Sequence, residues 1–334
     1  EIAKKKIFKS IDHANLNSIK IIKEAFENVK ERIGRRPMLM DFITQNSIDP
    51  KVIISKFNNY YLFLKKYNYI GKIFRKDAVK NLTFLSKELL PGLKKSDYEV
   101  LENMIKGNDY SLKSEDDMKT SLNILSLNYF GKNEKERYGS PIVDPNTKRL
   151  SKTFSEYLKD KDYRSFVFDI LNLAKYYNEK IQNSGNDLIL YNQYTRLDFL
   201  KLVNWRNDKK NMANNIYGYR VLDEYIPLFI TYHKSEDIDD SIKYEDHFLN
   251  QEELAWVSRK NVSLKNKEIN QIINHKEDGK TIYIFVKKND SEGSQHYYLG
   301  EAEYMKGSAN ETTNVTEDKI VTMNFIMKTP IRDD

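Results

Sequence analysis

Apolar residues recur at helical spacing through residues 1–182 of the chain. One stripe follows the period of an amphipathic helix and comprises Ile19, Ile22, Phe26, Val29 and Ile33. The residue after this stripe, Gly34, suits the left-handed conformation that ends many helices. A second long stripe covers 166–181, whereas the polar stretch 131–149, with glycine and prolines, predicts a loop. The stripes predict the core of a helical bundle.

Two serines predict helix starts within this half. Ser96 is followed three residues later by Glu99, which is the spacing of a capping box. Ser114 precedes the acidic run 115–117, which suits the first turn of a helix. The stretch 34–66 is compatible with a helix-turn-helix that reads DNA, but two short helices of any function give the same pattern.

After Gly185 the chain changes to short runs of Tyr, Ile, Val, Phe and Thr bounded by turn-forming residues. Thr195 and Asp198 predict the start of a short helix over 199–204, and a further helix is predicted over 249–257. Strands are predicted at 217–222, 227–232, 281–287, 297–304 and 319–328. The predicted fold class is therefore α+β, with a helical coupling domain at 1–185. A β-rich domain at 186–334 would follow, built on a small, bent, mixed sheet or barrel.

The composition excludes several kinds of site. The 334 residues are enough for two domains with cores. The chain has no cysteine, so disulfides and thiolate metal sites are excluded, and its scattered histidines predict no metal site. No apolar run approaches the roughly 20 residues that span a bilayer, so no membrane partner is expected. No signal-peptide pattern is present, which predicts a cytoplasmic location. The first residue is Glu1 rather than Met, so we expect a piece of a longer protein.

Positive charge is concentrated in the helical half. Residues 1–190 contain 35 Lys and Arg against 25 Asp and Glu, whereas residues 191–334 contain 20 against 24. Two stretches lack acids, Lys51–Lys76 with seven basic residues and Leu254–Lys267 with four. Either stretch could follow a phosphate backbone. For the first, a solvated lysine-rich surface is the alternative, whereas basic residues beside Trp256 favour a functional role for the second.

Aromatic rings, carboxylates and basic residues recur together between Tyr194 and Tyr304. Rings stack on bases, carboxylates read polar base edges, and Arg and Lys hold phosphates. The candidate base-binding residues are Tyr232, Trp256, Asp246, Tyr219, Tyr244 and His233. The candidate residues for the DNA backbone are Arg259, Lys260, Ser258, Lys234 and Lys265. Each has a structural alternative: the rings could fill a core, Asp246 could cap a following element, and His233 could be structural.

Catalytic motifs are missing from the chain. It contains no phosphate-binding Gly-x-x-x-x-Gly-Lys-Ser/Thr loop, no His-Glu-x-x-His, no His-x-Lys and no Gly-x-Ser-x-Gly elbow. We therefore expect no enzyme activity, cofactor or metal in this chain. A metal-dependent nuclease that uses Glu301 and Glu303, which share one strand face, is kept as an alternative.

Six patches occur in one order: 194–198 followed by Trp205, 216–219, 227–234, 243–248 and 256–259. In this order the chain resembles the C-terminal region of SauUSI-like Type IV restriction enzymes. These bacterial enzymes fuse a phospholipase D-like nuclease to a superfamily 2 helicase and cut modified DNA. The resemblance covers about residues 194–260, with a weaker likeness at 36–66. It implies a target-recognition module whose partners are double-stranded modified DNA and the helicase and nuclease domains of a parent chain.

The resembled family is similar to base-flipping readers of modified cytosine of the SRA and EVE kind, which implies a bent β-sheet pocket. The function expected is binding of 5-methylcytosine or 5-hydroxymethylcytosine in DNA, with the base extruded at a cost of a few kcal/mol. The methyl group itself contributes only about 0.8 kcal/mol of burial, so a fitted apolar slot is needed. The main competitor is a docking module that binds the helicase and reads no base, which the acidic balance of residues 191–334 favours.

Overall fold

The computed structural model describes residues 19–112, 114–183, 188–205, 218–233, 246–289, 293–314 and 317–332. The described chain divides into two compact units. The helical unit holds the described residues within 16–187 and 201–211, and the β unit holds those within 188–200 and 212–334. The helices and the mixed sheet confirm the predicted α+β class.

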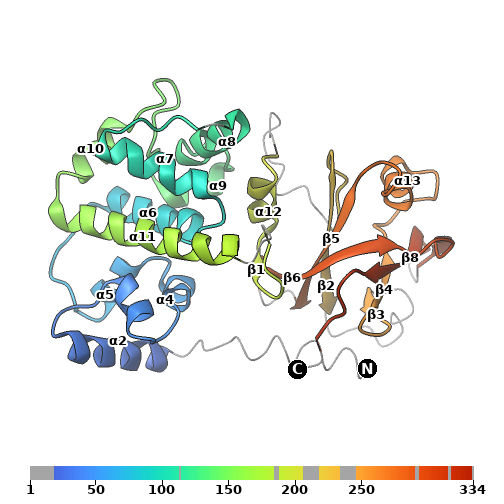
Figure 1. Ribbon diagram of the computed structural model, residues 1–334, viewed down its shortest axis with the longest axis horizontal. Helices are drawn as coiled ribbons and strands as arrows, with labels where there is room; N and C mark the ends of the chain where they lie inside the picture. The colour runs from blue at the N-terminus through green and yellow to red at the C-terminus, as the bar shows by residue number, and fades with distance from the viewer. Residues whose placement is uncertain are drawn as a thin grey trace. The chain divides into compact units, whose positions relative to one another are not determined.

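The helical unit surrounds one long helix, α11, which crosses its middle in Figure 1. The elements are α2 Ile19–Ile33, α3 Leu39–Thr44, α4 Pro50–Phe57, α5 Tyr60–Lys66, α6 Lys76–Phe84, the π-helix η1 Leu85–Leu89, α7 Lys95–Lys106, α8 Glu115–Leu125, α9 Lys132–Tyr138, α10 Lys152–Tyr157 and α11 Lys161–Asn183. Buried aromatic rings fill the interior, among them Phe26, Phe63 and Phe166.

Local capping explains where several of these helices begin and end. The stripe that starts at Ile19 forms α2, and Gly34 follows it with a φ of 69°. The side chain of Ser114 accepts a hydrogen bond from the Asp117 backbone N–H and begins α8 as predicted. Ser96, by contrast, does not cap α7, which begins one residue earlier at Lys95. Ser96 and Asp97 are buried at this helix start, where Asp97 accepts a hydrogen bond from the Ser121 hydroxyl of α8.

The described residues of the β unit form an eight-stranded mixed sheet. Its elements are β1 Gln193–Tyr194, α12 Arg196–Leu202, β2 Tyr225–His233, β3 His247–Phe248, β4 Glu253–Val257, α13 Lys267–Ile273, β5 Thr281–Asn289, β6 His296–Tyr304, β7 Asn310–Thr313 and β8 Lys319–Met327. The strand order is β2-β5-β6-β8-β4-β3, with β1 beside β6 and β7 beside β8. The β2–β5 pair is parallel, whereas the other pairs are antiparallel.

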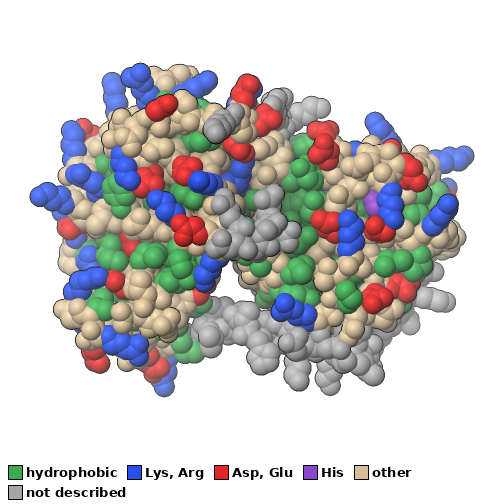
Figure 2. All heavy atoms as spheres, viewed as in Figure 1, with side chains coloured by type: hydrophobic (Ala, Val, Ile, Leu, Met, Phe, Trp, Pro, Cys, Tyr) green, Lys and Arg blue, Asp and Glu red, His purple; other side chains and the backbone are tan. Residues whose placement is uncertain are grey.

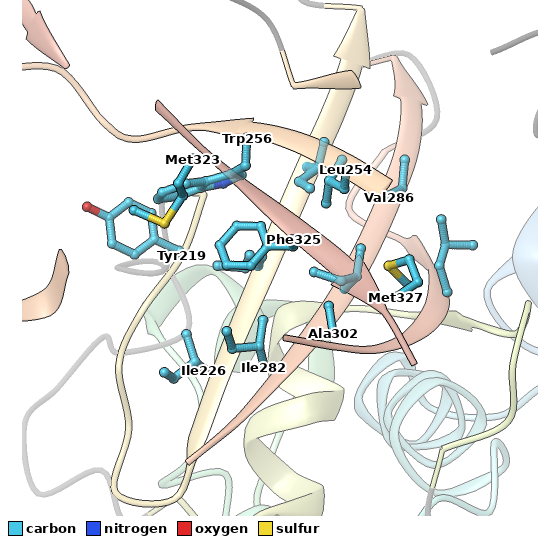
Figure 3. Close-up of a cluster of buried hydrophobic side chains, with 14 of the residues drawn as sticks. Tyr219, Ile226, Leu254, Trp256, Ile282, Val286, Ala302, Met323, Phe325 and Met327 are labelled. Atoms are coloured by element: carbon cyan, nitrogen blue, oxygen red, sulfur yellow. The ribbon is translucent and has the colours of Figure 1, made fainter. Parts of the chain in front are cut away.

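One apolar cluster lies between the two ends of this sheet. Alternate residues of β2, such as Ile226 and Leu228, point into it, as strand periodicity requires. Trp256 from β4 and Phe325 from β8 meet them from the other end of the sheet, so the strands wrap around a shared core (Figure 3). The pairing of β5 with β6 shifts between Ile284, which faces Gly300, and Phe285, which faces Tyr298. The extra residue of this bulge therefore lies in β6, beside Gly300, whose φ of 116° suits glycine.

The opposite face of β2, β5 and β6 carries a second layer of rings. Phe229 stacks on Phe285 at 4.6 Å, and Phe199 of α12 lies 5.5 Å from the same Phe285 ring. Thr195 and Asp198 form the predicted capping box, because each side chain accepts a hydrogen bond from the other's backbone N–H. This box fixes the start of α12 and therefore the position of Phe199 on the sheet.

Two element predictions were wrong. The helix predicted over 249–257 is a turn followed by strand β4, since Leu254 and Trp256 alternate into the core and pair with β8. Asn250 makes the turn, because its side chain accepts hydrogen bonds from the backbone N–H groups of residues 252 and 253. The loop predicted at 131–149 contains α9, which buries Tyr138. In the strand predicted at 217–222, Tyr219 forms an isolated bridge to Leu228, and residue 217 lies outside the described chain.

Candidate nucleic-acid interface

The end of strand β4 brings several of the predicted residues together. Trp256 lies in the strand, the acid-free stretch continues beyond it towards α13, and Tyr219 packs against it from the segment beside β2. Asp246 reaches the same point, because its Oδ1 accepts a hydrogen bond from the Val257 backbone N–H at 2.8 Å. Residues from three patches separated in sequence therefore meet at one place in the fold.

Tyr219, Trp256 and Arg259 form a layered contact. The two rings meet edge to face with centroids 5.0 Å apart, and each is at most 2% exposed. The Arg259 guanidinium lies over the Tyr219 ring, 4.1 Å from its centroid, and its side chain is 36% exposed. Burial raises the pKa of the Tyr219 hydroxyl, and the nearby guanidinium acts in the opposite direction. Arg259 is thus a positioned cation over the Tyr219 ring, which in turn packs against Trp256.

Tyr232 lies in the same apolar cluster as Tyr219 and Trp256, and Tyr232 and Asp246 make their hydrogen bonds to β3 and to the end of β4. The Tyr232 ring lies parallel to Phe248, and its hydroxyl accepts a hydrogen bond from the Phe248 backbone N–H at 2.7 Å. Burial raises the pKa of Tyr232 to about 12. Both Tyr232 and Asp246 are buried, so in the structure they hold β3 and the end of β4 in place.

The three remaining described candidates differ in exposure. The Ser258 hydroxyl is buried, where it donates to the Arg259 carbonyl at 3.0 Å and accepts from the Val321 N–H at 2.9 Å. The side chain of Lys260 is 62% exposed and pairs with Asp318 at 2.9 Å. Lys265 is exposed in the turn before α13. Ser258 therefore has a structural role here, whereas the two lysines are open to a ligand on the surface.

Two acids next to the predicted cations were missed from the sequence. Glu268 pairs with the Arg259 guanidinium, and Asp318 pairs with Lys260. The sequence contained a signal for Glu268. Asn266 is a typical helix-capping residue, and a helix that begins after it places Glu268 in the first turn, close to the preceding basic loop. The sequence contained no such signal for Asp318, because this residue is distant from Lys260 in the chain and only the fold brings the two together. Both acids reduce the free positive charge of the surface (Figure 2 shows blue and red side chains side by side on the β unit).

The rest of the predicted site lies beyond what the structure describes. Tyr244 and Lys234 fall outside the described residues, and so does the side chain of His233. Within the described part, the arrangement offers buried rings, a guanidinium above them and exposed lysines nearby. Such a surface can bind an anionic backbone beside an apolar floor.

The residues of the nuclease alternative have other partners. Glu301 pairs with Lys328 at 2.7 Å, and Glu303 pairs with Lys276 at 2.5 Å. Among the described residues, no group of three or more histidine or acidic side chains is placed to hold a metal ion. The described helices also include none long and apolar enough to cross a membrane.

Two family models match the chain, one in each half. Residues 188–334 match a family described as Domain of unknown function (DUF3427), and residues 22–183 match Domain of unknown function (DUF8090). A comparison with curated proteins finds no match.

Solved structures with similar arrangements include DNA-binding and restriction proteins. The SRA domain of SUVH5 in a complex with hemi-methylated CG DNA is 10% identical, with a TM-score of 0.30 over 43% of this chain and 91% of that chain. The DNA modification-dependent restriction endonuclease AspBHI is 10% identical, with a TM-score of 0.27 over 40% of this chain and 69% of that one. The Type IV phosphorothioation-dependent restriction endonuclease ScoMcrA is 10% identical, with a TM-score of 0.29 over 86% and 60%.

Proposed function

We propose that this chain binds double-stranded DNA that contains a modified cytosine, as the recognition module of a modification-dependent restriction enzyme. The observation that carries the proposal is the convergence at the end of β4. There Arg259 lies over the ring of Tyr219, Tyr219 packs against Trp256, and Asp246 accepts a hydrogen bond from the same strand end. The ordered patches that carry the family resemblance thus include residues that meet in one place.

The cations after β4 would contact the DNA backbone. Arg259, Lys260 and Lys265 lie in an acid-free stretch on the surface, and each phosphate they neutralise would release counterions. Such contacts position a duplex but carry no information about the base. They would therefore add the same free energy to the binding of modified and plain DNA.

The rings and Asp246 would provide the discrimination. Tyr219, Trp256 and Tyr232 are buried. An extruded base would therefore either lie against the outer side of this apolar layer or displace a neighbouring side chain to contact the rings. A carboxylate can accept the amino proton of cytosine. An apolar slot of this kind discriminates one methyl group by about 10–200-fold. Direct base contacts by Tyr232, Trp256, Asp246, Tyr219, Tyr244 and His233 remain predictions.

In this proposal the chain itself performs no cleavage. The helicase and nuclease domains of the parent protein would supply ATP-driven movement and DNA cutting, and the helical unit would couple them to the reader. The lysine partners of Glu301 and Glu303 support a structural role for both carboxylates.

A competition binding assay tests the proposal. Fluorescent duplexes of one sequence, with cytosine, 5-methylcytosine or 5-hydroxymethylcytosine at the same position, would be titrated at matched salt without metal or ATP. We expect tighter binding to a modified duplex by about tenfold or more. Equal affinity for all three would refute modified-base reading, and cleavage on addition of magnesium would support the nuclease alternative instead.

A docking module for the helicase is the second candidate function. Two exposed apolar side chains, Leu249 and Ile326, lie along an outward row of the sheet with Glu253 and Glu303. Apolar and acidic groups in one row suit a protein partner better than a phosphate backbone. Replacing Leu249 and Ile326 with serine would weaken helicase binding under this alternative and leave DNA affinity unchanged under the first.

A further inference from the structure

We propose that the helical unit has its own binding surface for the phosphate backbone of nucleic acid, formed by Lys23 of α2 and Lys66 of α5 around the ring of Tyr67. We call these three residues the Tyr67 lysine surface. The inference rests on the proposed function only in taking the same DNA as its partner. It adds a contact that would hold DNA whether or not a modified base is present.

The core beneath this surface fixes the position of Tyr67. Phe26 of α2 stacks on Tyr69 at 4.1 Å and meets Phe63 of α5 at 5.5 Å, so α2 packs against α5 and the turn after it. Tyr67 meets Phe57 edge to face at 6.0 Å and Phe63 at 5.5 Å. Its ring is half-buried at the margin of this cluster, with the rest of the ring open towards solvent.

Two ammonium groups converge on that ring. The Lys23 Nζ lies 4.8 Å from the Tyr67 centroid, and the Lys66 Nζ lies 5.9 Å from it and 5.5 Å from the Phe57 centroid. Because both are measured to one centroid, the two charges are within about 11 Å of each other, roughly a Debye length at 0.1 M salt. Both side chains are exposed. A phosphate near both would relieve their mutual repulsion.

Neighbouring lysines of α2 form ion pairs, whereas among the described residues Lys23 and Lys66 form none within 4 Å. Lys20 pairs with Glu24 at 3.8 Å and Lys30 pairs with Glu27 at 3.3 Å, both within α2. Among the described residues, no carboxylate oxygen lies within 4 Å of the Nζ of Lys23 or Lys66. Glu27 lies one turn after Lys23 along α2, and its main partners are Tyr69 and Lys30: the hydrogen bond with Tyr69, the pairing with Lys30 and, least of these, the charge of Lys23 lower its pKa.

The surrounding sequence favours a polyanion over a single small anion. Lys66 belongs to the acid-free stretch Lys51–Lys76, where Lys56 and Lys65 add further charge close to it in the chain. Duplex DNA carries one charge about every 1.7 Å of its axis, so several phosphates can face such a surface at once. Many other Lys and Arg side chains stand around the helical unit (Figure 2), but they are interleaved with acids. Other lysines also lie over rings, such as Lys30 over Tyr69, but Lys23 and Lys66 share one ring and have no carboxylate oxygen within 4 Å among the described residues.

Salt-dependent binding to plain duplex DNA tests this surface. The variant Lys23→Gln/Lys66→Gln would be compared with Lys20→Gln/Lys30→Gln, which removes the same charge from ion-paired lysines. We expect the first variant to lower the slope of log affinity against log salt by close to two units. Its affinity at low salt should fall by about tenfold or more, whereas the control should change little. Lys23→Arg/Lys66→Arg should bind as the parent does, because it keeps both charges.

Four outcomes separate this inference from the proposed function. Equal losses in both glutamine variants, or none in either, would overturn the inference. An unchanged slope with a preserved preference for modified duplex would overturn it and leave the proposed function standing. A reduced slope in a chain without any preference would support the inference and count against modified-base reading. A chain that binds no DNA at all would refute both.

Discussion

The Arg259–Glu268 pair makes a specific prediction about DNA affinity. Because the guanidinium is both stacked on Tyr219 and paired with Glu268, a phosphate that approaches Arg259 competes with the carboxylate. Glu268→Gln keeps the shape of the side chain and removes its charge. We expect this variant to bind plain and modified duplex more tightly than the unmutated chain does, by the same factor. The reason is that phosphate contacts do not depend on the identity of the base.

The size of the increase follows from the geometry of the pair. The two side chains are 36% and 32% exposed, and ion pairs of such exposure contribute about 0–1 kcal/mol. Losing that competition raises the binding constant by up to about fivefold. Removing the repulsion between Glu268 and a phosphate about 7 Å away adds about 0.6 kcal/mol before screening by salt. Together these terms predict an increase of about two- to tenfold, with a stability change of about 1 kcal/mol or less.

Fluorescence anisotropy at 50–100 mM salt would measure the effect. Glu303→Gln is the matched control, because Glu303 also pairs with a lysine, Lys276, in the β unit and is 39% exposed. The same increase in both variants would assign the effect to net charge alone. Unchanged or weaker binding in Glu268→Gln would refute the competition and would mean that Glu268 orients Arg259 for its contact.

Three further predictions concern other parts of the chain. Trp256→Ala should destabilise the β unit by about 3–5 kcal/mol, because the ring is 2% exposed, and a thermal melt should show a fall of about 10 °C or more. A folded variant that loses only the modified-base preference would instead support direct stacking. Arg259→Ala should reduce the salt slope by about one unit for both duplexes, and a loss of preference alone would contradict a backbone role. Burial raises the pKa of Asp169 to about 6, so its protonated form stabilises the native state, fully below about pH 4 and less as pH rises through 6. The stability of the parent relative to Asp169→Asn should therefore fall by about 2 kcal/mol from pH 4 to pH 7 in urea titrations, and a constant difference would refute this.

Local signals in the sequence predicted much of the fold. Gly34, Ser114 and the Thr195–Asp198 box mark helix ends because each forms hydrogen bonds or adopts backbone angles within a few residues. The strands at 227–232 and 281–287 were found because their residue types favour a pleated, buried surface. Such features depend on neighbours in the chain, which is why they can be recognised without a structure.

Long-range contacts explain what the sequence missed. Residues 249–253 contain helix-forming glutamate and glutamine, yet pairing with β8 makes Glu253–Val257 a strand. The candidate site shows the same limit. The patches indicated which residue types belong together, but the partners Glu268 and Asp318 and the burial of Trp256 depend on packing between distant segments.

The charge distribution suggests different roles for the two proposed surfaces: the surface of the helical unit contributes affinity for the DNA backbone, and the β unit contributes discrimination of the base. In the β unit, Arg259 and Lys260 are paired with carboxylates, whereas in the helical unit Lys23 and Lys66 have no carboxylate within 4 Å among the described residues. Backbone contacts add equally to the binding of modified and plain DNA, so they cannot change the ratio between the two affinities. That ratio must come from apolar and hydrogen-bonding contacts, which salt screens little. Under both proposals, raising the salt concentration should therefore weaken binding to both duplexes steeply and leave the preference for the modified duplex nearly constant. A preference that disappears with salt would mean that the discrimination itself is electrostatic and would remove the reason for assigning it to the rings around β4.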